Sequence, residues 1–533
     1  MAVRDRRLPE LALFAAAAVL HTWPLASAPG TWARVDNADT ALNTWAIAWV
    51  GIATLRDPFN LFHGDIFFPE PRTLAFSEIM LPQALMGAPL TLAGFDPVIV
   101  YNLLVLAGFA LCGFAMAWVV SEWTGSRLAG GVAGFAYAFN AHTLVRFGHL
   151  QALHVQYLPV ALYALHRTIE TAGRRWAGIL ALALVAQALT SNYLLVMAAT
   201  AMVAAVMVRP DAWRPRPLLA LTGAAAAATL MLAPFLYQYW LVHTQQGLMR
   251  SFDEVGTYSG TWRDWLSTGG RLHYRLWSHR FMPDTTSSLF PGVTVSLLAI
   301  AALVRGEAWR DPRARMVLVI AVVGAVLAFG ANLPGYRWLY DHLPLLQGIR
   351  AASRFGWLTL FALPILAGFT VSVWIRRLSP SKAAALATAL SIAVTIEALR
   401  APMAFTAYEG IPKIYERIAG MPDIVLAELP FPPRTSIQDN GPSVLYAAWH
   451  LKPLLNGYSG FTPASYSKHE AIMRLFPAAD SVQSLRAIGV SHVLLHKRRV
   501  AADLLKLCAE SPEIVLVADQ GDEVLYSLSP GGR

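Results

Sequence analysis

The sequence predicts an α-helical polytopic membrane protein with about 11 transmembrane helices, followed by an extracytoplasmic α/β domain at the C-terminus. Of its 533 residues, 56% are hydrophobic and only 14% are charged, and the mean hydropathy is +0.46. Soluble globular chains run at about 45–50% apolar and about 25% charged residues. This composition excludes a disordered chain and argues against one large soluble enzyme.

Apolar runs alternate with short polar loops along the first three quarters of the chain. A helix needs roughly 20 apolar residues to cross the hydrocarbon core of a bilayer. Eleven runs approach or reach this length, at 8–27, 97–120, 126–141, 152–169, 177–190, 193–208, 218–240, 292–304, 316–331, 355–375 and 383–399. The pairs 126–141/152–169 and 177–190/193–208 also fit hairpins that do not fully cross.

The basic residues predict the orientation, because cytoplasmic loops of membrane proteins are rich in Lys and Arg. With the N-terminus inside, 17 of the 42 basic residues fall in short inside loops, and the C-terminal domain lies outside. This distribution explains much of the net charge of +9 without a nucleic-acid partner. Residues 1–28, with Arg4–Arg7, an apolar stretch and Ala26-Ser27-Ala28, also resemble a cleavable signal peptide.

The division into domains follows the composition. Residues 1–399 form the predicted transmembrane domain, including the outer loops 28–96 and 241–291, and residues 400–533 form the soluble outer domain. In the tail, charges rise and strand-like runs alternate with helical patterns, which predicts a small α/β domain. The strands are expected at Ile424–Glu428, His492–His496, Ile514–Ala518 and Glu523–Leu528, and the helices at 466–476, 481–488 and 500–508. Cys112 and Cys508 are too few and too far apart for a disulfide framework.

The first outer loop carries two aspartates soon after the first span. The sequence there reads Asp36-Asn37-Ala38-Asp39. Residues 38–55 are apolar and rich in Trp, which predicts a helix lying along the membrane surface. Asn37 or Asp39 is a suitable N-cap for that helix. Capping accounts for one of the two aspartates, so a functional role is open for the other.

This layout resembles the GT-C superfamily of polytopic membrane glycosyltransferases, which carry an acidic residue or pair just after the first span. The resemblance implies a bacterial hexosyl- or pentosyltransferase that moves a sugar from a polyprenyl-phosphate-linked donor to a glycan, lipid or protein acceptor. It also implies that Asp36 or Asp39 is the general base that deprotonates the acceptor hydroxyl. Many members have adjacent acidic residues, whereas two residues separate them here, so the choice between Asp36 and Asp39 stays open.

A leaving phosphate requires cations or hydrogen-bond donors. We expect Arg146 and His149, between two spans, and Arg350 and Arg354, directly before another, to supply them on the outer side. Arg350 and Arg354 lie outside against the usual distribution of charge. The alternatives are an ordinary outer loop with snorkelling side chains, and docking of the C-terminal domain. No metal site or cofactor is predicted, although a divalent cation is not excluded.

Substrate contacts are expected from Asp253, Glu254 and Tyr258 in the second long loop, and from Tyr458 in a glycine-rich turn of the tail. An interfacial helix and a tight loop are the simpler explanations of these two segments.

Two other function classes compete with the enzyme, a transporter or flippase of a lipid-linked substrate and a non-catalytic envelope assembly protein. Few charges lie within the spans and no internal repeat is seen, which favours the enzyme. The absence of an Asn-x-Ser/Thr motif fits the bacterial inner membrane.

Overall fold

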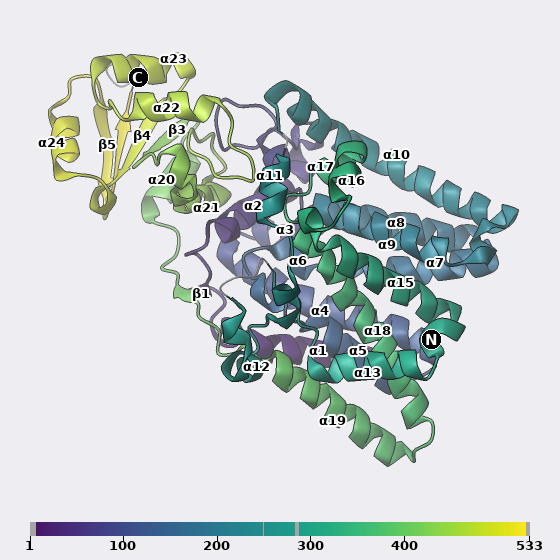
Figure 1. Ribbon diagram of the computed structural model, residues 1–533. Helices are drawn as coiled ribbons and strands as arrows, with labels where there is room; N and C mark the ends of the chain where they lie inside the picture. Colours follow the sequence, from purple (N-terminus) through teal and green to yellow (C-terminus); the bar gives the residue numbers. More distant parts are fainter. Residues whose placement is uncertain (1–6, 249, 283–286, 529–533) are drawn as a thin grey trace. The chain divides into compact units, whose positions relative to one another are not determined.

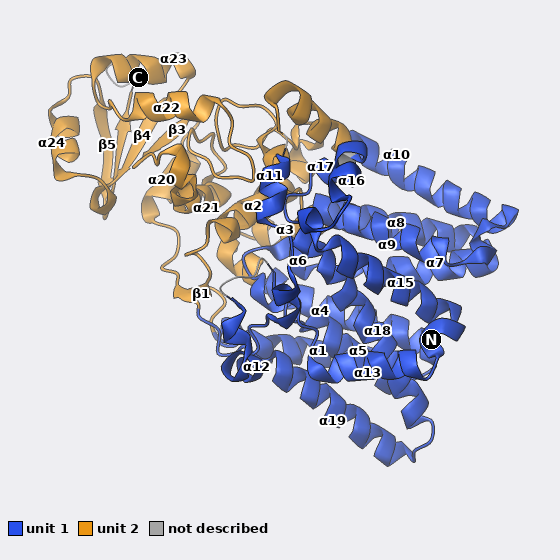
Figure 2. Ribbon diagram, viewed as in Figure 1, with its two compact units in different colours: residues 1–27, 103–234, 249–404 blue, residues 28–102, 235–248, 405–533 orange. Residues whose placement is uncertain are grey.

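The computed structural model describes residues 7–248, 250–282 and 287–528, so Arg4 and Arg6 lie outside the described residues. The chain divides into two compact units (Figures 1 and 2). Unit 1 comprises residues 1–27, 103–234 and 249–404, and unit 2 comprises residues 28–102, 235–248 and 405–533.

Unit 1 is a bundle of helices, and each of the eleven predicted spans coincides with one helix. These are α1 (Leu8–His21), α4 (Pro97–Thr124), α5 (Arg127–Ala138), α7 (Tyr157–Thr171), α8 (Arg174–Thr190), α9 (Asn192–Met207), α10 (Pro215–Gln246), α13 (Val293–Val304), α15 (Pro312–Leu327), α18 (Gly356–Ile375) and α19 (Pro380–Ala398). The first residues of α4 and the last turns of α10 belong to unit 2. Side chains of Ser126, Ser191 and Asp311 cap α5, α9 and α15 at their N-termini.

Four helices among the described residues are long and apolar enough to cross a membrane. They are α4, α10, α19 and the helix that runs from Ala352 to Ile375. The apolar side chains Leu219 and Leu230 of α10 are 75% and 74% exposed, and Ile392 of α19 is 53% exposed. Such exposure suits a surface that faces lipid rather than water. The number of crossings, predicted as eleven, and their orientation stay predictions.

Small residues allow the helices of unit 1 to pack closely. A Cβ on Gly324 of α15 would lie 2.7 Å from the Leu358 side chain of α18, and one on Gly130 of α5 would lie 2.4 Å from the Ala117 carbonyl oxygen of α4. Glycine at these crossings therefore lets the helix backbones approach one another, as is common in membrane bundles. Near the other end of α18, Val371 packs in an apolar cluster with residues of α5, α13 and α19.

Unit 2 contains a four-stranded sheet in the order β3-β4-β6-β5. Strands β3 (Leu426–Leu429) and β4 (His492–His496) are parallel, whereas β4 and β5 (Val515–Gln520) both pair antiparallel with β6 (Glu523–Ser527). The four strands and the three helices expected in the tail are all present. The helices of the tail are α20 (Lys413–Gly420), α21 (Gly441–His450), α22 (Ser465–Met473), α23 (Ala479–Ile488) and α24 (Ala502–Glu510), of which α20 and α21 were not predicted. Both cysteines are free, as expected.

The first outer loop packs with the tail. It forms α2 (Ala38–Arg56) and α3 (Leu81–Leu92), and α2 packs against both α3 and α21. The backbone N–H groups of Phe67 and Phe68 donate to the carbonyl oxygens of Asn456 (3.0 Å) and Leu454 (2.9 Å), and Leu454 N–H donates to Asp65 O (2.6 Å). The predicted division assigned residues 28–96 to the transmembrane domain. The structure groups that segment with the tail in unit 2, and the division into a transmembrane and an outer domain stays a prediction.

The helix predicted at 38–55 is present as α2. A placement along the membrane surface would leave one face of it to lipid, yet twelve of its residues are buried within the protein. Trp45, which is 1% exposed, donates its indole N–H to Asp65 Oδ1 at 2.6 Å, in the segment between α2 and α3. The tryptophan content of α2 therefore reflects, at this position, burial inside the protein rather than contact with a bilayer.

The burial of the Asp65 carboxyl predicts that the stability of the protein depends on pH. The carboxyl is 7% exposed, its Oδ2 has no hydrogen-bond partner among the described residues, and burial raises its pKa from 3.8 to about 7 against the opposing Trp45 hydrogen bond. The folded protein thus holds a proton that the unfolded chain releases. Its free energy of unfolding should fall between about pH 4 and pH 7, by up to about 4 kcal/mol, and this contribution should be constant above pH 7.

Asp65→Asn should remove this dependence, since the amide is neutral at every pH and keeps an oxygen for Trp45. We expect the variant to exceed the natural protein in stability at pH 8 and to match it near pH 4.5. Thermal unfolding of the full-length protein in detergent at both pH values measures the difference. Asp57→Asn, at an exposed position of the same loop, is the matched control. An equal effect of Asp65→Asn at both pH values would contradict the assignment.

Candidate active site

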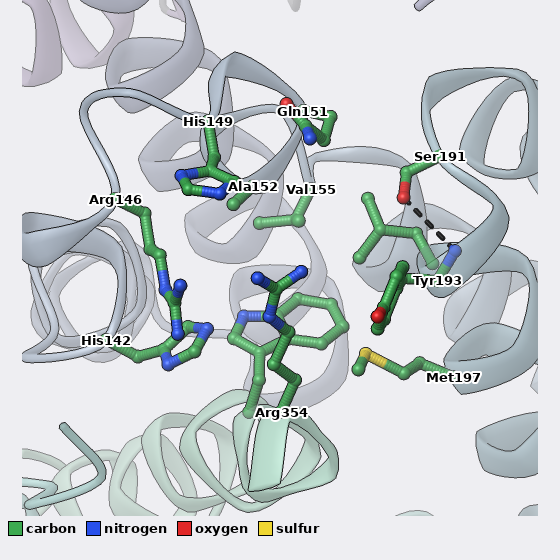
Figure 3. A pocket seen from close by; sticks show the side chains of 12 residues that line it. His142, Arg146, His149, Gln151, Ala152, Val155, Ser191, Tyr193, Met197 and Arg354 are labelled. Carbon is green, nitrogen blue, oxygen red and sulfur yellow. Dashed lines mark hydrogen bonds between the residues drawn. The ribbon is translucent and has the colours of Figure 1, made fainter. Parts of the chain in front are cut away.

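Unit 1 contains a pocket of about 450 Å³, including the space at its mouth. Figure 3 shows its side chains, which come from three places in the chain. The turn between α5 and α7 provides His142, Arg146 and His149, the start of α9 provides Tyr193, and the 3-10 turn η10 (Ala352–Phe355) provides Arg354. Three of the four residues predicted to bind phosphate, Arg146, His149 and Arg354, therefore lie around one pocket.

The turn after α5 positions the first group. The Asn140 side chain accepts a hydrogen bond from Thr143 N–H (3.0 Å) and donates to Tyr137 O (2.6 Å). This ends α5 and starts the short turn η4 (Thr143–Val145), which is followed by α6 (Leu150–Leu153). The spacing of His142, Arg146 and His149 would put them on one face of a continuous helix. The segment is instead broken into two short turns, and the three side chains still reach the same pocket.

The pocket is strongly cationic. Arg146 and Arg354 both line it, and no Asp or Glu is found among its lining residues in the described part of the chain. His142 is 5% exposed, and its pKa lies well below the usual value because burial and then the neighbouring Arg146 and Arg354 disfavour its protonation. His142 is therefore neutral at physiological pH and offers hydrogen bonds, whereas the two guanidinium groups supply the charge.

Among the described residues, Arg354 contacts an aromatic ring and pairs with no acid. Its guanidinium carbon lies 4.8 Å from the centroid of the Tyr193 ring. Its Nε is buried and has no acceptor among the described residues. A guanidinium that stacks on a ring keeps its in-plane N–H groups available for a planar or tetrahedral anion. The pocket is thus suited chemically to an anionic ligand such as a phosphate.

Arg350 does not line this pocket. Its side chain lies 4.9 Å from the centroid of the Tyr258 ring, and its Nη1 lies 3.5 Å from Glu254 Oε1. Glu254 also pairs with Arg250 at 3.4 Å. The structure therefore brings Arg350 together with two of the predicted substrate residues, Glu254 and Tyr258, in a second cluster of unit 1. The third, Asp253, is exposed in the first turn of the short helix α11 (Phe252–Thr257).

The two aspartates of the first outer loop have different surroundings within unit 2. Asn37 caps α2, its side-chain oxygen accepting the backbone N–H groups of Asp39 (2.9 Å) and Thr40 (3.2 Å), so neither aspartate is needed as the cap. Asp36 is half exposed and accepts a hydrogen bond from Arg34 Nε at 3.1 Å. Asp39 lies in the first turn of α2, where its Oδ1 accepts the phenolic hydrogen of Tyr458 at 2.8 Å. The structure thus joins two predicted site residues that are 419 positions apart.

Sequence reasoning missed Tyr193 and Trp357 as pocket residues. Tyr193 is the first residue of a predicted span, and a tyrosine at the end of a span is typical of the membrane interface. Trp357 lies just inside the span that begins at 355, where a bulky apolar residue is expected. No local signal distinguishes either residue from an ordinary span boundary, because the pocket forms only when α9 and α18 pack beside the turn after α5.

One group of three side chains in the described residues has the composition of a metal site. The nearest ligand atoms of His496, Asp522 and Glu523, in the tail, lie within 4.8 Å of one another. Its members already have partners: His496 Nε2 lies 3.1 Å from the buried Glu428 carboxylate, and Asp522 accepts the backbone N–H of Arg498 at 2.9 Å. These contacts satisfy the group as a network of protein charges, and we assign no metal to it.

Comparison with known proteins gives no match to any protein-family model and no match among curated protein sequences. Several solved structures match across most of the chain, including the following two. The oligosaccharyltransferase of Archaeoglobus fulgidus in its apo form is 12% identical, with 92% of this chain and 69% of that chain covered and a TM-score of 0.50. ArnT from Cupriavidus metallidurans bound to undecaprenyl phosphate is 14% identical, with 97% and 98% covered and a TM-score of 0.50. Both are GT-C glycosyltransferases.

The chain has the GT-C fold. This confirms at the level of the fold the resemblance that the sequence predicted. Together with the long apolar helices, the GT-C fold identifies a membrane protein. Identities of 12% and 14% establish the fold alone, so donor, acceptor and residue roles have to be argued from this chain's own side chains.

Because the described lining of the pocket is basic, removing one of its positive charges should raise the stability of the protein. Arg354 faces Arg146 and has no carboxylate partner in the described pocket lining, so Arg354→Met should relieve repulsion and stabilise the ligand-free protein by about 1 kcal/mol. Arg350→Met is the matched control, and it should not stabilise, because Arg350 pairs with Glu254.

Thermal unfolding of ligand-free, full-length protein at low and at high salt measures both variants. The difference between them should shrink at high salt, since salt screens charge repulsion at a partly open site. If Arg354→Met is no more stable than Arg350→Met at low salt, charge repulsion at the pocket does not lower the stability of the protein.

Proposed function

We propose that this chain is a glycosyltransferase of the bacterial cytoplasmic membrane that uses a lipid-linked sugar donor. The donor is a polyprenyl-phosphate sugar, and the acceptor is a hydroxyl of a glycan, lipid or protein at the outer face of the membrane. The observation that carries the proposal is the cationic pocket with Arg146 and Arg354 on a GT-C fold. Two guanidinium groups at one pocket favour a phosphate that gains charge as the reaction proceeds.

The chemistry requires one bond to form and one to break. The acceptor oxygen attacks the anomeric carbon of the sugar while a carboxylate takes the hydroxyl proton. The bond between that carbon and the phosphate oxygen breaks, and its electron pair stays on the polyprenyl phosphate. Arg146 and Arg354 offset the added negative charge, and His142 and His149 lie beside them in the lining of the pocket.

Asp39 is the preferred candidate for the base, and Asp36 is the second. Tyr458 donates a hydrogen bond to Asp39 Oδ1 at 2.8 Å, which orients the carboxylate. Asp36 is more exposed and is already paired with Arg34. In this proposal Tyr458, Glu254, Asp253 and Tyr258 contribute to substrate binding.

Substitution of the aspartates tests the proposal. Asp39→Asn keeps the size of the side chain and its contact with Tyr458 but removes the base, so kcat should fall about 100-fold or more. Asp36→Asn should have a smaller effect, the double variant should be inactive, and Asp57→Asn is the matched control. The assay is release of undecaprenyl phosphate from undecaprenyl-phosphate hexoses and pentoses by full-length protein in liposomes.

Full activity in the double variant would exclude an aspartate of this segment as the base. A protein that moves the lipid across the bilayer without consuming it would be a flippase. If the lipid is neither consumed nor moved, an assembly role is favoured. Both of the last two outcomes would overturn the proposal.

A further inference from the structure

The loop before α18 carries two arginines whose side chains make different contacts. Tyr193 contacts this loop at two places. Arg350 turns to Glu254, whereas Arg354 lines the pocket. Between them the Tyr193 hydroxyl accepts two backbone N–H groups, from Arg350 at 3.0 Å and from Ala351 at 3.3 Å. The ring of the same tyrosine lies under the Arg354 guanidinium. One side chain therefore holds the backbone of the loop and the head of its pocket arginine.

Tyr193 is itself fixed at the start of α9. The Ser191 side chain caps this helix by accepting the Tyr193 backbone N–H at 3.1 Å, and Figure 3 shows the contact beside the pocket. The extended backbone of Ser191 separates α8 from α9, so the tyrosine starts a new helix rather than continuing the old one. Its position is thus set by a helix terminus, which is a more rigid support than a loop.

We propose that Tyr193 is a positioning residue that sets the orientation of Arg354 for a phosphate ligand. This inference rests on the proposed function, because it assigns a role in binding the phosphate of the lipid-linked donor. Holding the guanidinium flat on a ring reduces the freedom that Arg354 would lose on binding. Anchoring the loop at 350–351 directs Arg350 to Glu254 and Arg354 to the pocket. The two arginines therefore have different roles.

Two substitutions separate the contributions of the hydroxyl and the ring. Tyr193→Phe keeps the ring but removes the acceptor of the two backbone N–H groups, and we expect about threefold weaker binding of undecaprenyl phosphate. Tyr193→Leu also removes the ring, and we expect about tenfold weaker binding. Tyr274→Phe, at a tyrosine that is 43% exposed and lies outside the pocket, is the matched control and should bind as the natural protein does. The measurement is equilibrium binding to full-length protein in detergent, with thermal unfolding to verify that each variant folds.

A double-mutant cycle with Arg354→Gln decides whether Tyr193 acts through the arginine. Arg354→Gln alone should weaken binding about 10- to 100-fold, because charge-assisted hydrogen bonds are lost. Adding Tyr193→Leu to Arg354→Gln should then cause little further loss. A tyrosine that only supports the fold would weaken binding equally in both backgrounds.

The outcomes separate this inference from the proposed function. If Arg354→Gln binds undecaprenyl phosphate as tightly as the natural protein, the pocket is not the phosphate site and the proposed function fails with it. If Arg354→Gln weakens binding but Tyr193→Leu has the same effect with and without Arg354, only the positioning role is overturned. Unchanged binding in both Tyr193 variants also overturns it and leaves the proposed function intact.

Discussion

The hydrogen bonds of Asn456 are the interaction on which unit 2 depends. Its amide oxygen accepts the Glu428 backbone N–H at 2.7 Å and its amide nitrogen donates to the Glu428 carbonyl at 3.0 Å. The same nitrogen also donates to Asn440 Oδ1 at 3.0 Å. The Asn456 carbonyl receives Phe67 N–H, and two residues later Tyr458 bonds Asp39. A segment of three residues therefore connects strand β3, the first outer loop and the candidate base. All of these groups are buried or partly buried, so each bond left unmade would carry a desolvation cost.

A second constraint concerns unit 1, where Arg146 and Arg354 line one pocket whose described lining holds no Asp or Glu. The charge of the neighbouring Arg350 is balanced in the usual way, because Arg350 pairs with Glu254 and stacks on Tyr258. Arg354, four residues later, stacks on the Tyr193 ring and has no ion pair with a carboxylate among the described residues. In the proposed function, binding of an anion accounts for this arrangement, even though it lowers the stability of the fold. The contrast between two arginines in one loop is stronger evidence for an anion site than the total charge of the chain.

The sequence predicted the elements well because their signals are local. Apolar length located a helix in all eleven expected runs, and alternation located strands such as His492–His496 within one or two residues. It could not assign the first outer loop to the tail, because that grouping depends on backbone hydrogen bonds between positions almost 400 residues apart, as between Phe67 and Asn456. Helix α21 was missed for a related reason: it is short, and its burial against α2 supplies a stability that propensity does not show.

The candidate site was predictable in its residue types and not in its geometry. Charge at a predicted outer boundary singled out both Arg350 and Arg354 equally, since each would be unusual on that side. Their separation arises from Tyr193, an aromatic residue at a span boundary that resembles many others. In unit 2 the Asp39–Tyr458 contact joins the start of the chain to its tail. Because Tyr458 follows directly on the Asn456 network, the orientation of the proposed base depends on the fold of the C-terminal domain. In the proposed function, the tail therefore has a role in holding the base.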